Sequence, residues 1–131
     1  MPILCKSKDK ILKSWPKTDF YILDTEYTSW EGSFENNWKK PNEWREIIEI
    51  GSIQVSNLEG NFVIKSEFNC YIKPTKNPVL SNYISKLTGI NQKKIDLSGV
   101  NFEKGLSLFN KFLSKNIPII FNGNDGEVFI D

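Results

Sequence analysis

Asp24 and Glu26 are the residues whose type and spacing most directly suggest chemistry. They follow the apolar run 21–23 and are separated by a single threonine. In a β-strand, residues two apart point to the same side, so the two carboxylates would lie together. Like charges this close repel each other, and a divalent cation removes that cost. Carboxylate oxygens suit Mg²⁺ or Mn²⁺. The other reading of the pair is the exposed end of a strand.

A third acid, Asp125, comes shortly after a second apolar run at 117–121. Parallel strands present ligands at their carboxyl ends, so neighbouring strands would bring Asp125 close to Asp24. Three carboxylates are what a pair of cations requires in a phosphoryl-transfer site. Glu127 is an alternative ligand. We prefer Asp125 because it follows the strand directly and places Val128 at an apolar position of the next helix.

The elements that must position these acids can be predicted from patterning. Segments 19–26, 46–55 and 62–72 are typical of strands, and the turn residues at 57–60 predict an antiparallel meander. Ser81 is a predicted N-cap of a short helix that Gly89 closes. Asn101 is the predicted cap of a second helix, with a stripe expected in the core: Phe102, Leu106, Phe109 and Leu113. The run 117–121 predicts a buried parallel strand, and Asp125 would begin another helix.

Residues 30–44 have no apolar period and hold three of the four tryptophans: Trp30, Trp38 and Trp44. A surface loop keeps such rings by folding them onto the body or by offering them to a ligand. We expect packing for at least two of them. Cys5 and Cys70 lack the spacing of a disulfide framework or a zinc site, and Cys70 is expected to pack as a small apolar residue.

Four segments together give the sequence a family resemblance. They are residues 21–28 (YILDTEYT), 44–51 (WREIIEIG), 78–81 (PVLS) with 87–90 (LTGI) and Gln92, and 121–125 (FNGND). In this order and spacing they resemble the DEDD superfamily of 3′–5′ exonucleases, and more narrowly its DEDDh branch, which includes RNase T and histone-mRNA exonucleases. The resemblance implies an α/β, RNase H-like exonuclease fold with a mixed sheet, in which a parallel strand follows three antiparallel strands and helices pack around it. The C-terminal part of that fold would be missing.

The resemblance also implies roles for single residues. Asp24 would bridge or bind both of two Mg²⁺ (or Mn²⁺) ions, Glu26 would hold the cation on the nucleophile's side, and Asp125 would hold a metal. The pocket for the 3′-terminal nucleotide would be lined by Tyr27, Thr28, Leu87, Thr88 and Ile90. Leu87, Thr88 and Ile90 could at the same time form the end of a helix that is anchored in the core. Glu49 is expected to be a satisfied polar residue and not a metal ligand.

The implied function is a phosphodiester hydrolase that removes 5′-nucleoside monophosphates from the 3′ end of single-stranded RNA or DNA. Two alternatives remain: a non-catalytic nucleic-acid-binding or interaction domain on the same scaffold, and another RNase H-like nuclease with a different cleavage mode. Active members of the resembling branch carry a later histidine general base and a fourth acid. This chain has no histidine. Loss of a general base costs about 10²–10⁴ in rate, so weak or no activity is expected. Truncation of a longer reading frame would explain both absences.

The bulk composition sets limits on these interpretations. The 131 residues fit one domain, divided here into a basic extension at 1–17, with five lysines, and a partial exonuclease domain at 18–131. A net charge of +1 gives no general attraction to nucleic acid, so binding must come from a local site or bound cations. There is no secretory signal and no apolar run of ~18 residues, so we expect a cytoplasmic protein without a membrane partner. Oligomeric state and the choice between RNA and DNA stay open.

Overall fold

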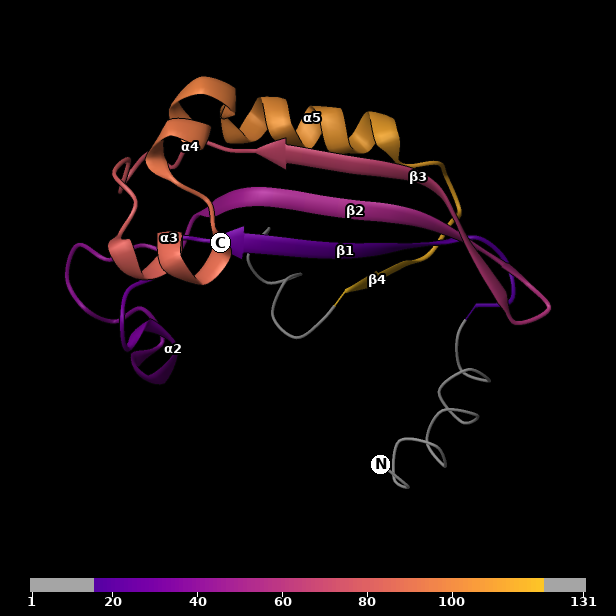
Figure 1. Ribbon diagram of the computed structural model, residues 1–131, viewed down its shortest axis with the longest axis horizontal. Helices are drawn as coiled ribbons and strands as arrows, with labels where there is room; N and C mark the ends of the chain where they lie inside the picture. The colour runs from indigo at the N-terminus through magenta and orange to yellow at the C-terminus, as the bar shows by residue number, and fades with distance from the viewer. Residues whose placement is uncertain (1–15, 122–131) are drawn as a thin grey trace.

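The computed structural model describes residues 16–121, which form a four-stranded mixed sheet with helices on both faces (Figure 1). Strands β1 (Phe20–Tyr27), β2 (Ile47–Leu58) and β3 (Asn61–Tyr71) make an antiparallel meander. The short β4 (Ile119–Phe121) runs parallel to β1, giving the order β3-β2-β1-β4. The predicted mixed sheet, with three antiparallel strands followed by a parallel strand, is confirmed.

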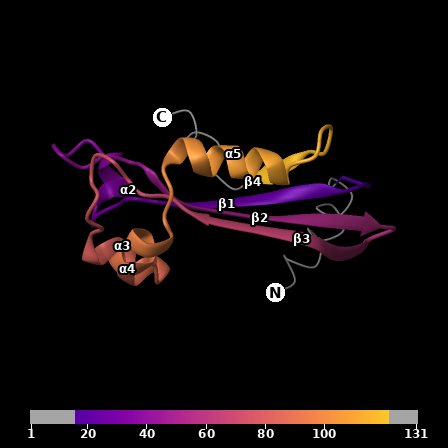
Figure 2. The same ribbon diagram turned by 90° about the horizontal axis from the view of Figure 1, so that it is seen from above.

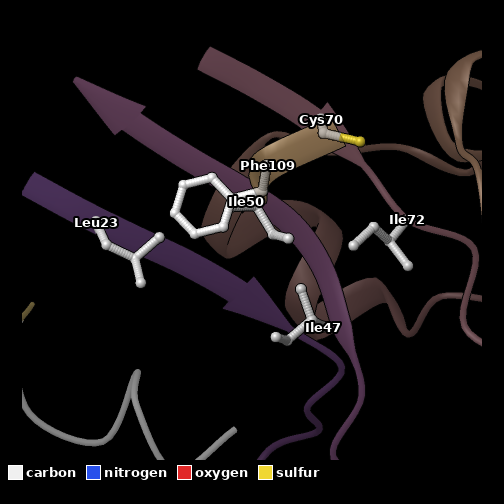
Figure 3. Packing of buried hydrophobic residues seen from close by; sticks show 6 residues of the cluster. All are labelled: Leu23, Ile47, Ile50, Cys70, Ile72 and Phe109. Carbon is white, nitrogen blue, oxygen red and sulfur yellow. The ribbon is translucent and has the colours of Figure 1, made fainter. Parts of the chain in front are cut away.

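Helix α5 (Phe102–Phe112) covers one face of the sheet, and α3 (Asn82–Thr88) and α4 (Gln92–Ser98) lie against the other (Figure 2). Under α5, side chains from three strands meet one helix residue in a cluster of Leu23, Ile47, Ile50, Cys70, Ile72 and Phe109 (Figure 3). The helix approaches closely, because a Cβ on Gly105 would lie 2.9 Å from Cδ1 of Ile72. Burial raises the pKa of the Cys70 thiol, which packs as an apolar residue, as expected.

A second cluster fixes α3 and α4 to the opposite face. Ile48 of β2 is fully buried against four apolar side chains from this region: Leu80, Ile84, Ile90 and Ile95. The predicted N-cap is confirmed, since the Ser81 side chain accepts a hydrogen bond from the Ile84 amide at 3.1 Å. Gly89 ends α3 with φ +76°, a conformation that favours glycine. Both faces of β2 are therefore covered at this end of the sheet.

Several features of the structure differ from the sequence expectations. Strand β4 is parallel as predicted but not buried, since Ile119 and Phe121 are exposed at the edge of the described sheet. Phe102 was expected in the core stripe of α5, but it is 36% exposed because the first turn of the helix lies beyond the buried cluster. Helix α4, capped by Asn91, was not predicted, and neither was the single-turn α2 (Ser33–Asn36) within the tryptophan-rich loop. Within residues 16–121, no helix is long and apolar enough to cross a membrane.

Candidate active site

Asp24 and Glu26 stand at the carboxyl end of β1, between β2 and β4. The neighbours Tyr21, Leu23 and Thr25 are buried on the α5 face, as alternation along a strand requires. Asp24 is exposed and Glu26 half-buried on the opposite face, which also carries α3 and α4. The register with β2 shifts between Glu26 and Tyr27, because Ile48 of β2 is an extra, bulged residue there, and bulges are common beside active sites. The structure thus brings the first two predicted acids together.

A shallow hollow of about 510 Å³ opens beside Asp24. Its wall comes from all three antiparallel strands: Ile22, Asp24, Gly51, Ser52, Ile53, Glu67, Phe68 and Asn69. Gly51 pairs directly with Asp24 across the strands, and a Cβ there would make only ordinary contacts, 3.7 Å from the Asp24 carbonyl oxygen. The backbone therefore does not require glycine at this position. Its effect is to leave open space next to the Asp24 carboxylate.

The register of β4 bears on the third predicted acid. Phe121 pairs with Leu23, so the carboxyl end of β4 arrives one residue before Asp24. Asp125 follows four residues later and lies outside the described residues, as does its alternative Glu127. Within 16–121, no group of three or more acidic, histidine or cysteine side chains could hold a metal ion. Asp24 and Glu26 supply hard oxygen ligands on an open face, which fits Mg²⁺ or Mn²⁺, but two carboxylates need a further ligand to hold a pair.

Glu49 lies directly across from Glu26 and has partners of its own. Its Oε2 accepts a hydrogen bond from Asn69 Nδ2 at 3.2 Å. Burial, together with the nearby Glu49 charge and a hydrogen bond to it, raises the pKa of Tyr71. Glu49 is therefore a satisfied polar residue, as expected.

Thr28 connects the end of β1 to the tryptophan-rich loop. Its hydroxyl donates to the Trp44 carbonyl and accepts from the Glu46 amide at 2.9 Å. Its amide donates to the Glu46 carbonyl at 2.8 Å, and its carbonyl accepts from Trp38 Nε1 at 2.9 Å. The residue is 2% exposed, and every polar group that it has is engaged with this loop. Thr28, which was predicted to line the pocket, thus tethers the tryptophan-rich loop to the end of β1, and its side chain is directed into the protein.

The aromatic side chains of this region behave in two ways. Tyr27, Phe34 and Trp38 form a ring cluster, with the Tyr27 and Trp38 centroids 5.5 Å apart. The Arg45 guanidinium lies over both of those rings, 5.2 Å from the Trp38 centroid. Trp44, in contrast, is 51% exposed. Trp38 therefore packs, as expected, while Trp44 presents its ring to solvent.

The predicted residues on α3 have different exposures. Leu87 is 61% exposed, whereas Ile90 is 3% exposed and belongs to the second cluster. The Thr88 hydroxyl donates to the Ile84 carbonyl at 2.8 Å and accepts from the Ile90 amide at 3.1 Å. Leu87 is thus accessible on the face that carries Asp24, while Thr88 and Ile90 shape the end of the helix. Their contacts with substrate stay predictions.

Sequence reasoning gave no role to Glu46, which organises the loop after β3. Its carboxylate accepts from the Thr75 amide and hydroxyl, the Lys76 amide and the Asn77 amide, at 2.7–3.3 Å. Burial alone would raise the pKa of Glu46, but these hydrogen bonds together lower it below its ordinary value. A glutamate at the start of a strand carries no pattern that reveals such a contact 30 residues away.

Comparisons with known proteins show that the chain is similar to exonucleases. The RNase T family profile, described as "Exonuclease", matches residues 21–123. The chain is 38% identical over 108 residues to the 3′-5′ exonuclease Snipper of Drosophila melanogaster, covering 81% of the chain and 35% of that protein. It is 35% identical over 94 residues to the ERI1 exoribonuclease 2 of Xenopus laevis, covering 72% of the chain and 12% of the relative. The chain therefore spans about a third or less of the length of these relatives.

Solved structures show the same fold. The nuclease domain of 3′hExo, a DEDDh family member bound to rAMP, superposes with a TM-score of 0.71 at 24% identity, over 89% of this chain and 58% of that one. A 3′-exonuclease recognising the 3′ end of a histone mRNA stem-loop gives a TM-score of 0.66 at 25% identity, over 92% of this chain and 43% of that one. An E. coli ExoI–ssDNA complex with bound zinc gives 0.60 at 17% identity, over 86% and 23%.

Proposed function

Because the chain belongs to the RNase T exonuclease family, in its DEDDh branch, we propose that it carries the metal-binding part of a 3′–5′ exonuclease site. The proposed reaction removes 5′-nucleoside monophosphates from the 3′ end of single-stranded RNA or DNA. The main support for this proposal is that Asp24 and Glu26 lie on the same open face at the end of β1. The last residue of β4 pairs with Leu23, next to Asp24. The similar structures that recognise the 3′ end of a histone mRNA stem-loop and that bind single-stranded DNA support the choice of substrate.

In this proposal Asp24, Glu26 and Asp125 hold two Mg²⁺ or Mn²⁺ ions. When bound, the cations would activate a water and neutralise charge that develops on the phosphate. The open space at Gly51 admits a phosphate beside Asp24, because no side chain fills it. Leu87 offers an exposed apolar side chain to the terminal base or sugar. Since the chain has no histidine, we expect weak turnover at best from these 131 residues.

A 3′-labelled single strand incubated with Mg²⁺ or Mn²⁺ tests the reaction, and calorimetric titration of the cation tests the site independently of turnover. We expect cation binding by the full chain, loss of that binding in Asp24→Asn, and any stepwise release from the 3′ end to be lost with it. A circular substrate is the control, because an exonuclease leaves it intact. The second candidate, a non-catalytic nucleic-acid-binding or interaction domain, differs in the cation readout. It predicts that no cation binds, that nothing is released from the 3′ end, and that oligonucleotide binding without metal survives Asp24→Asn and Glu26→Gln.

A further inference from the structure

A second cavity, the Trp44 pocket, lies at the end of the sheet toward which β1 runs. Its volume is about 520 Å³. The lining comes from the loop before β2, the end of β3 and the start of α5, and includes Glu43, Trp44, Arg45, Lys73, Lys76 and Phe102. Ile47 and Ile72, which also line it, belong to the cluster under α5, so the pocket opens on the α5 side of the sheet. Figure 2 shows this side opposite α3 and α4, and hence opposite the face of Asp24.

Trp44 is an exposed ring on a fixed backbone. Its amide donates to Asn77 Oδ1 at 3.0 Å, and its carbonyl accepts from the Thr28 hydroxyl. The ring itself is 51% exposed, with Lys76 Nζ 3.6 Å from its centroid. Lys76 is held in turn, since its amide donates to Glu46 at 2.7 Å. A ring positioned in advance loses little conformational entropy when a flat ligand stacks on it.

Glu43 gives the pocket a carboxylate, because its side chain is part of the lining. A carboxylate accepts hydrogen bonds, so it suits a ligand that brings an N–H or O–H group. The same pocket carries Lys73 and Lys76, whose ammonium groups suit a phosphate.

We propose that the Trp44 pocket binds one nucleotide of a single-stranded nucleic acid, upstream of the 3′ end. The base stacks on Trp44, with Glu43 accepting from a base N–H or a sugar hydroxyl and the two lysines facing the phosphate. An acidic peptide could also bind the two lysines. However, the Glu43 carboxylate would repel its acidic side chains, and these side chains have no ring that could stack on Trp44. The pocket lies on the other face from Asp24, so it suits a nucleotide removed from the cleaved end. The identity of the strand rests on the proposed function.

The test is binding of a short fluorescein-labelled single strand to the full chain in EDTA, followed by anisotropy. Stacking on one aromatic ring accounts for about 5- to 100-fold in affinity, so Trp44→Ala should weaken binding by about tenfold or more. Trp44→Phe, which keeps a ring, should bind nearly as wild type. Lys76→Gln should lower the slope of log affinity against log salt by about 0.7, as expected for one phosphate contact. Lys111→Gln is the matched control, because Lys111 is an exposed lysine in the last turn of α5, away from the pocket.

Four outcomes decide the proposal. Equal affinity of wild type and Trp44→Ala overturns it, and so does displacement by polyglutamate as effective as that by unlabelled strand. A free nucleoside monophosphate that binds as tightly as the strand overturns the assignment to a polymer. The Trp44 effect is measured in EDTA, so a full chain that binds no cation by calorimetry but keeps the Trp44 effect would refute the proposed function and spare this inference. If circular dichroism shows Trp44→Ala to be unfolded, Lys76→Gln and Trp44→Phe carry the test.

Discussion

Replacing Thr28 by valine should separate the structural role of this residue from the substrate contact that its family position implies. Valine keeps the β-branched shape, so the 2% exposed site stays filled. It removes the hydroxyl that donates to the Trp44 carbonyl and accepts from the Glu46 amide. The backbone bonds of Thr28 to Glu46 and Trp38 are unaffected, so the change isolates the side chain.

The expected loss follows from the two groups left without a partner. A buried donor or acceptor that loses its partner costs about 1–3 kcal/mol. Both hydrogen bonds are only partly buried, so the groups left behind can regain some water and each share should be at the low end. We therefore expect Thr28→Val to lower the free energy of unfolding by about 2 kcal/mol in total. For a domain of this size, that is a decrease of about 8 °C in melting temperature.

Thermal and urea unfolding followed by circular dichroism would measure this loss. Thr28→Ser is the matched control, because it keeps the hydroxyl and removes only a methyl group, at a cost of about 1 kcal/mol or less. Indole fluorescence should also change in Thr28→Val, since the tether of Trp44 is broken. A valine variant as stable as wild type, or a serine variant less stable than the valine variant, would refute the assignment of Thr28 as the tether of the loop.

Two further predictions concern stability. The lowered pKa of Glu46 means that its charge stabilises the fold above its unfolded value of about 4.5 and that this contribution is lost as pH falls through the folded pKa. The difference in unfolding free energy between wild type and Glu46→Gln, about 1 kcal/mol after allowance for solvent screening, should thus shrink toward zero below that pH; a difference that grows in acid would contradict it. Gly105→Val should destabilise by about 1–3 kcal/mol in the same unfolding assay, despite better helix propensity, because its Cβ would press on Ile72. Ser107→Val, at an exposed position of the same helix, is the comparison for helix propensity without the contact with Ile72.

Much of the sheet could be predicted because its determinants are local. Alternating and β-branched residues mark β1 to β3, and the turn at Gly60 lies where Asn and Gly predicted it. Asn101 and Ser81 cap the helices that their side chains indicated, since capping needs only three or four neighbouring residues. Asp24 and Glu26 shared a face for the same reason, as a period of two requires nothing distant.

Some of the features that were missed depend on contacts between distant residues. The α5 stripe was right at Phe109 and Leu113 but wrong at Phe102, because nothing in the periodicity shows that the first turn lies beyond the buried cluster. Helix α4 has the same seven-residue length as α3, and its local signal, the Asn91 side chain that accepts from the Lys94 amide at 2.8 Å, was overlooked. Gln92, noted only as part of a family motif, has a structural role: its side chain accepts from the Leu80 amide at 2.7 Å and donates to the Pro78 carbonyl. The contacts of Phe102 and Gln92 are not local in sequence.

The end of β1 links the acidic face and the Trp44 pocket. Glu26 is the last residue of β1 on the face of Asp24. Two residues later, the hydroxyl of Thr28 is directed toward the loop that carries Trp44. The register between β1 and β2 shifts after Glu26, where Ile48 of β2 is the extra residue, so the pairing changes between the two positions. A strand of nucleic acid that reached from one face to the other would pass around this end of the sheet. Weakening the tether at Thr28 should then reduce binding at the Trp44 pocket while leaving Asp24 in place, since β1 pairs with β2 through the whole segment before the bulge.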